Sequence, residues 1–77
     1  MQWRKIDAWH YKSSDGYYIS IAGPAGCTVY TAWVPGKWRG FKHKPVLYVS
    51  TGDEQEKLRQ CVEVCRQHRE QGEKDAA

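Results

Sequence analysis

The sequence predicts an α+β fold, a three- or four-stranded antiparallel meander with one C-terminal α-helix packed on one face. Two observations lead to this fold class. Short runs in which aromatic or apolar side chains alternate with polar ones, separated by glycine-containing turns, dominate the first two thirds of the chain and are typical of strands joined as hairpins. One amphipathic stretch with a helix-start signal follows, and such a helix buries its apolar side against a sheet.

The first two predicted strands flank a strong hairpin signal. Residues 8–13 (AWHYKS) alternate aromatic and polar side chains, and residues 17–22 (YYISIA) form the clearest strand. Asp15-Gly16 lies between them, and this dipeptide is favoured in tight hairpin turns because such turns need positive φ. Within the second strand, side chains at alternate positions point to opposite faces of the sheet, so Tyr17, Ile19 and Ile21 share one face.

The next predicted elements are a third strand at residues 27–34 (CTVYTAWV) and a fourth, short strand at 46–50 (VLYVS). The turn GPAG at 23–26 leads into the third strand, because glycine permits positive φ and proline fixes a corner. Residues 35–45 (PGKWRGFKHKP) are predicted to be a loop. Proline at each end disfavours a central strand, and two glycines loosen the middle.

A helix is predicted to begin at Thr51. Thr51 and Glu54 have the spacing of a capping box, in which the hydroxyl and the carboxylate satisfy free backbone N–H groups of the first turn. Apolar residues then recur at helical spacing and form a narrow stripe that is expected to lie on the sheet. The stripe consists of Leu58, Cys61, Val62 and Cys65.

The 77 residues are expected to form a single domain over 1–77, with a loose leader at 1–7 and a frayed tail at 72–77. No run is apolar for long enough to span a bilayer, and the N-terminus lacks an apolar signal region, so a cytoplasmic location without membrane contact is expected. The three cysteines are odd in number and do not describe a disulfide framework, which indicates reduced thiols.

Positive charge is concentrated in the front of the chain. Residues 1–48 carry seven Lys or Arg against two acids, whereas residues 49–77 carry five against seven. The predicted loop holds four of these cations beside two aromatic residues, and no acid. Such cations can neutralise phosphates while a ring stacks on a base. The candidate binding residues in the loop are Lys37, Trp38, Arg39, Phe41, Lys42, His43 and Lys44.

Two other interpretations of the loop stay open. Its aromatic rings could fold back onto the core and leave the lysines solvated. A protein partner could instead bury Trp38 as a hot spot and pair with Arg39. On the strands, Tyr18, Tyr30 and Trp33 are candidates for the sheet face that the helix leaves open, and core packing is the competing role, because a slip of one residue reverses their facing.

The sequence argues against a metal site and an enzyme. Cys61, Cys65 and His68 lie on one side of the predicted helix, as zinc ligands could, with Cys27 or His43 as the fourth. The two cysteines fall within the apolar stripe, however, where a small buried thiol is an ordinary core residue. The histidines match no known catalytic pattern, and a small core leaves little room for a substrate pocket. We therefore expect no cofactor and no small-molecule substrate.

The whole chain resembles small proteins encoded by phages and prophages, in Trp9, DGYYIS, YTAW and the helix STGDEQEKLRQCVEVC. This resemblance implies a protein that acts by binding nucleic acid or by blocking a host protein, as anti-CRISPR proteins do. The element order is also similar to the sheet-reading DNA-binding domains of the AP2 and integrase arm-binding kind. Those domains place Arg on their strands, whereas residues 17–22 and 27–34 carry no Arg or Lys, which argues against groove reading by the sheet.

We therefore expect a small non-enzymatic binding module that contacts nucleic acid through the basic, aromatic loop. The alternative is a phage-type inhibitor or adaptor that binds a host protein through the same loop and the aromatic sheet face. Salt dependence of binding separates the two, because phosphate contacts release counterions.

Overall fold

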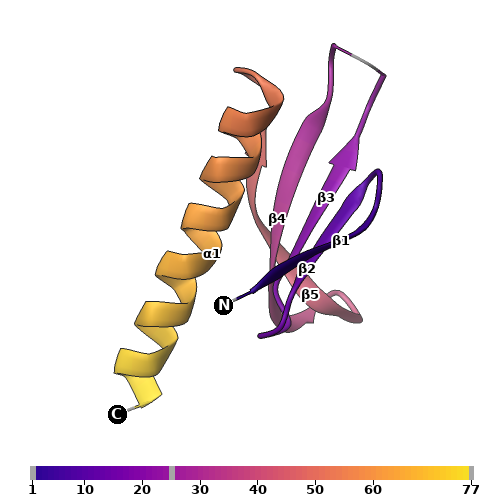
Figure 1. Ribbon diagram of the computed structural model, residues 1–77. Helices are drawn as coiled ribbons and strands as arrows, with labels where there is room; N and C mark the ends of the chain where they lie inside the picture. Colours follow the sequence, from indigo (N-terminus) through magenta and orange to yellow (C-terminus); the bar gives the residue numbers. More distant parts are fainter. Residues whose placement is uncertain (1, 25, 77) are drawn as a thin grey trace.

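The computed structural model describes residues 2–24 and 26–76, with side chains described as far as Gln71. Five strands form one antiparallel sheet: β1 (Trp3–Asp7), β2 (His10–Ser13), β3 (Tyr18–Ala22), β4 (Val29–Trp38) and β5 (Phe41–Val49). Their order in the sheet is their order in the chain, and α1 (Glu54–Ala76) lies against one face (Figure 1). The predicted α+β meander with a C-terminal helix is confirmed, with five strands rather than three or four.

The N-terminal residues depart from the prediction of a loose leader at 1–7. Trp3–Asp7 pairs with β2 as an edge strand, and the pairing shifts register between Lys5 and Asp7. Trp3 packs against the core, but the rest of the strand is exposed. Because its residues do not alternate between buried and exposed, the hydropathy pattern gives no sign of a strand.

Residues 35–45 form a hairpin rather than the predicted loop. β4 runs on to Trp38 and β5 starts at Phe41, so the turn consists of Arg39 and Gly40 alone. Both turn residues have positive φ, 47° and 84°. Positive φ at both positions is the signature of a type I′ turn, which matches the twist of the flanking strands.

The two prolines fit this hairpin because they lie where the sheet needs few donors. β3 pairs with β4 only as far as Trp33, so Pro35 has a strand on one side only, and the pairing with β5 is irregular between Pro35 and Trp38. Pro45 lies on β5, which is an edge strand. Proline is tolerated at edges and irregular positions, since a missing N–H there breaks no ladder.

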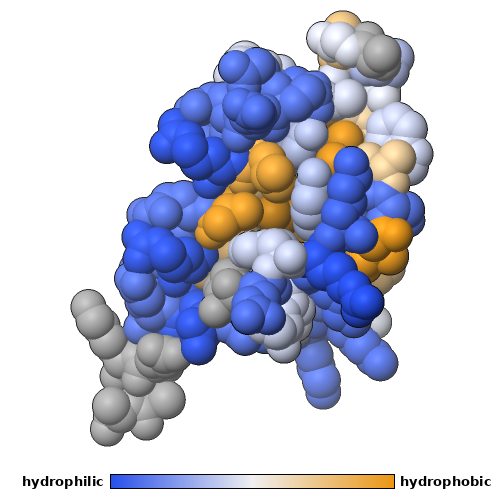
Figure 2. All heavy atoms as spheres, viewed as in Figure 1, coloured by the Kyte–Doolittle hydropathy of each residue, from blue (hydrophilic) through white to orange (hydrophobic). Residues whose placement is uncertain are grey.

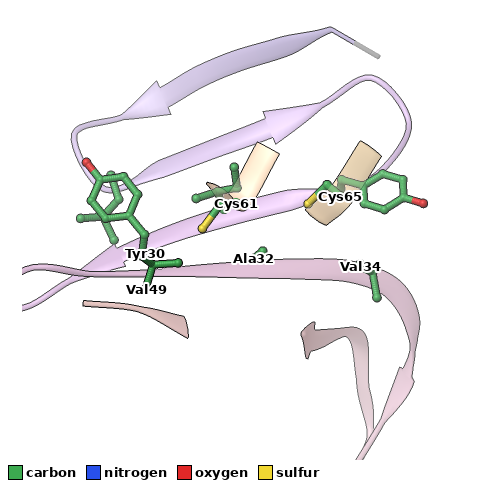
Figure 3. Packing of buried hydrophobic residues seen from close by; sticks show 9 residues of the cluster. Tyr30, Ala32, Val34, Val49, Cys61 and Cys65 are labelled. Atoms are coloured by element: carbon green, nitrogen blue, oxygen red, sulfur yellow. The ribbon is translucent and has the colours of Figure 1, made fainter. Parts of the chain in front are cut away.

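The core lies between the sheet and α1. Cys61 and Cys65 are fully buried and point from the helix toward β4, as Figure 3 shows. Hydrophobic residues gather along the seam between helix and sheet in Figure 2. The predicted helical stripe is confirmed for the two cysteines, whereas Leu58 and Val62 are partly buried at its margin. The sheet contributes Tyr17, Ile19, Ile21, Tyr30, Ala32, Val34 and Val49.

The helix begins later than the capping-box pattern predicts. Thr51 precedes α1, and Asp53 Oδ1 accepts a hydrogen bond of 2.8 Å from the backbone N–H of Glu56, which makes Asp53 the N-cap. The backbone stays helical to Ala76, past the predicted start of a frayed tail at residue 72. Ala77, the last residue of that predicted tail, lies outside the described residues. Within the described part of the chain, no helix is both long and apolar enough to cross a membrane.

Candidate nucleic-acid interface

The sheet face that α1 leaves open is organised by the strand register. Ile19 and Ile21 point to the helix, so Tyr18 and Ser20 point to the open face. Residues paired across neighbouring strands share a face and form rows. One row consists of Arg4, Lys12, Tyr18, Trp33 and Pro45, from β1 to β5. The adjacent row consists of Asp7, His10, Ser20, Thr31 and Tyr48.

Tyr18 and Trp33 are the central aromatic residues of this face. The Tyr18 ring lies between two imidazoles, with its centroid 5.4 Å from that of His10 and 6.0 Å from that of His43. The indole Nε1 of Trp33 donates a hydrogen bond of 2.9 Å to Ser20 Oγ, which fixes the orientation of the indole. The prediction that Tyr18 lies on the open face agrees with this geometry.

A shallow hollow opens beside these rings. It measures about 190 Å³ and is lined by Tyr18, Trp33, Phe41, Lys42 and His43. Pockets for drug-sized ligands usually hold roughly 300–1,000 Å³. The hollow therefore suits one flat ring between aromatic walls, with a lysine at its rim.

The tip of the hairpin is an ordered stack of side chains. The rings of Trp38 and Phe41 lie with centroids 6.0 Å apart and planes 29° from parallel. The guanidinium of Arg39 lies 5.1 Å from the centre of the Trp38 ring, within the range of a cation–π contact. Phe41 is 61% exposed, and neither ring belongs to the core cluster of the described residues. The interpretation in which these rings cap the core is therefore wrong.

The base of the hairpin is fastened to the β2–β3 turn. His43 Nε2 donates a hydrogen bond of 3.0 Å to the carbonyl oxygen of Gly16. Pro35 lies beside this turn, since a Cβ added at Gly16 would be 3.6 Å from Pro35 Cγ. These contacts hold His43 in place as a wall of the hollow.

The hairpin carries positive charge that no neighbouring acid offsets. Lys37, Arg39, Lys42 and Lys44 are all exposed. Residues 35–49 contain no Asp or Glu. Across the described side chains, none of these four cations forms an ion pair. Lys44 pairs with Val34, whose side chain is buried under the helix, so Lys44 extends on the opposite side of the hairpin from the hollow.

The two acids among residues 1–49, Asp7 and Asp15, both have partners of their own. Asp7 accepts hydrogen bonds from His10 Nδ1 at 2.9 Å and from the backbone N–H of Trp9 at 2.8 Å. These bonds, that of His10 first, lower the pKa of Asp7. Asp15 lies 2.7 Å from the guanidinium of Arg69 on α1. Positive potential at the hairpin and along β1 and β2 is thus weakly opposed.

The structure corrects one predicted contact residue and adds others. Tyr30 was a candidate for the open face, but it is buried beneath α1, where its hydroxyl donates to Glu54 Oε2 at 2.6 Å. Sequence reasoning missed Arg4 and Lys12, which share a row with Tyr18. These two residues could be found only from the register in which β1 and β2 pair, and the sequence of a polar edge strand does not predict that register.

The possible zinc ligands are occupied by other contacts. His68 Nδ1 is 2.8 Å from the hydroxyl of Tyr17 and hydrogen-bonded to it. Cys61 and Cys65 are fully buried in the core, where burial raises the pKa of the Cys61 thiol to about 11 and that of Cys65 to about 12. Among residues 2–24 and 26–71, no three or more His, Cys, Asp or Glu cluster as metal ligands would.

No family model, curated protein or solved structure matches this chain. Its function is therefore inferred from the chemistry of the hairpin and of the open face.

Proposed function

We propose that this protein is a non-enzymatic module that binds nucleic acid through the β4–β5 hairpin and the adjoining open face of the sheet. The observation that carries the proposal is the hairpin itself, where four exposed cations flank a stack of Trp38 and Phe41 with no acid within residues 35–49. Phosphates are neutralised by such cations, and bases stack on exposed rings. The proposal includes a cytoplasmic location, which suits three free thiols.

The local contacts of the hairpin support the proposal. The type I′ turn and the contact between Arg39 and Trp38 shape its tip, and the hydrogen bond from His43 to Gly16 fastens its base. Ordering a flexible loop costs free energy on binding, and a preformed tip avoids most of that cost.

The proposal is tested by the salt dependence of binding, measured by fluorescence anisotropy with labelled oligonucleotides. Four phosphate contacts made by the hairpin contribute about −3.6 to the slope of log affinity against log salt on duplex DNA and about −2.8 on a single strand. A quadruple variant carries Lys37→Gln, Lys42→Gln, Lys44→Gln and Arg39→Asn. Asn is chosen because it tolerates the positive φ of the turn. This variant should bind more weakly and with a flatter slope.

The control removes two positive charges from α1, away from the hairpin. Arg59 and Arg66 are exposed on α1, and each pairs with a glutamate three residues before it. The double variant Arg59→Gln, Arg66→Gln should keep the slope of the wild type. Binding by the quadruple variant at wild-type strength, or no binding of any nucleic acid at about 50 mM salt, would contradict the proposal.

A second candidate function is the blocking or bridging of a host protein through the same hairpin and sheet face. The observation that favours it is the exposure of apolar side chains along β5: Phe41 is 61% exposed, Val46 38% and Tyr48 64%. Apolar area of this kind marks protein contacts when it is contiguous. In that case Phe41→Ala and Tyr48→Ala would abolish capture of the partner, and salt would have little effect.

A further inference from the structure

We infer that the ligand is single-stranded nucleic acid, with one base held in the hollow between Tyr18, Trp33 and Phe41 and the adjoining backbone crossing the sheet over Lys12 and Arg4. This inference rests on the proposed function and names the form of nucleic acid that the same surface takes.

The hollow favours an unpaired base. Its walls come from three strands: Tyr18 on β3, Trp33 on β4, and Phe41 and His43 on β5. It is open to solvent above rings that are already fixed by the bonds of Trp33 to Ser20 and of His43 to Gly16. A base in a duplex is paired and stacked on both sides, so it cannot enter such a hollow without being extruded at a cost. A single strand offers its bases without that cost.

Two cations, Lys12 and Arg4, lie beside the hollow along the path that we infer for the nucleic-acid backbone. Lys12 and Arg4 follow Tyr18 along one row, and neighbouring strands lie about 4.8 Å apart, which places their backbones about 5 and 10 Å from that of Tyr18. Both side chains are exposed, and neither forms an ion pair within the described part of the chain. Lys42 lies at the hollow itself. Cations therefore flank the base site, as the phosphates flank a base.

A broader depression continues this path at the edge of the sheet. It measures about 690 Å³, and its lining includes Trp3, Arg4, Ile6 and Lys12. The depression lies at the end of the row that carries the two cations. A strand that leaves the hollow across β2 thus meets a second concave surface whose lining carries the positive charges of Lys12 and Arg4.

The experiment compares three labelled ligands of equal length at low salt: a single strand of thymidines, a duplex, and an abasic strand that keeps the sugar–phosphate backbone without bases. Stacking is worth about 1–3 kcal/mol per base, so one base in the hollow should make the intact strand bind about 5- to 150-fold tighter than the abasic strand. The duplex should bind more weakly than the intact strand, because only the contacts between the hairpin cations and its phosphates contribute to its affinity.

Variants locate the two parts of the path. Phe41→Ala should weaken binding of the intact strand and leave the abasic strand unchanged. Tyr48→Ala is its control, since Tyr48 is equally exposed on the same strand but does not line the hollow. Lys12→Gln and Arg4→Gln should each reduce the salt slope by about 0.7. Lys5→Gln is their control, because Lys5 lies on the other face of β1, 5.9 Å from the centre of the Tyr11 ring.

The outcomes separate this inference from the proposed function. If the duplex or the abasic strand binds as tightly as the intact strand, or if Phe41→Ala and Tyr48→Ala have equal effects, the base site is wrong while binding through the hairpin stands. If none of the three ligands binds at low salt, the proposed function fails and the base site with it.

Discussion

Four polar side chains join the start of α1 to the start of β4. Glu54 accepts hydrogen bonds of 2.6 Å from the hydroxyls of Thr28 and Tyr30. Lys57 is 3% exposed, and its ammonium donates to the carbonyl oxygen of Thr28 at 2.8 Å and to its hydroxyl at 3.1 Å. Each buried side-chain group in this cluster has a hydrogen-bond partner, and the Lys57 ammonium lies 3.7 Å from Glu54 Oε1, so Lys57 can be buried between α1 and the sheet with its charge paired.

The carboxylate of Glu54 makes stability depend on pH in the acid range. The hydrogen bonds from Thr28 and then Tyr30 lower the pKa of Glu54 in the folded protein below its ordinary value of 4.5. The stabilisation is therefore fully present at pH values above the pKa that Glu54 has in the unfolded chain. It is lost as the pH falls through the lower pKa that Glu54 has in the folded protein. Glu54→Gln should be less stable than the wild type near neutral pH, and the difference should shrink below about pH 4.5. Urea midpoints of the two proteins, measured at several pH values, give this difference in stability. A difference in midpoint that does not change with pH would contradict the role of the carboxylate.

The three cysteines should differ in reactivity. Cys61 and Cys65 are fully buried with raised pKa values, whereas Cys27 is exposed. Because the thiolate is the reactive form, a thiol reagent should modify one cysteine quickly in the native protein and all three in denaturant. Mass spectrometry of the native protein over time counts the modified thiols. Rapid modification of two or three thiols would contradict the packing of α1 on the sheet.

At the scale of elements, β3 and α1 could be predicted because their patterns are produced by burial on one side. The alternation of Ile19 and Ile21 with polar residues, and the spacing of Cys61 and Cys65, reflect their contacts with the core. The β4–β5 hairpin could not be predicted, because its strands extend beyond the core and its turn is Arg39-Gly40 rather than the usual Asn-Gly or Asp-Gly. The contact of Arg39 with Trp38 accompanies this unusual turn residue.

The start of α1 gives a direct test at this scale. Asp53→Ala should cost about 1 kcal/mol of stability, because the hydrogen bond from Asp53 Oδ1 to the backbone N–H of Glu56 is lost. Thr51→Ala should change stability by less than about 0.5 kcal/mol, since Thr51 is an exposed residue before the helix. Denaturant titration of both variants measures the difference. A larger loss for Thr51→Ala than for Asp53→Ala would restore the capping box predicted from the sequence.

For the whole molecule, the candidate surface arises from register across five strands. Tyr18 was identified from alternation within its own strand, but Arg4 and Lys12 join it only because β1 and β2 pair in this register. Tyr30 and Trp33 are both aromatic residues of β4, and their facing is decided by which side α1 covers. Contacts between distant segments therefore determine the site, and the local sequence pattern carries little of that information.

The most direct test of the central claim is to map where a short single strand contacts the protein, by chemical shifts of backbone amides and tryptophan indoles. We predict that the shifts move in residues 37–44, at Tyr18 and at the indole N–H groups of Trp33 and Trp38. Exposed residues of α1 such as Arg59 should keep their positions. Changes centred on α1, or changes confined to the chain ends, would contradict binding through the hairpin and the open face.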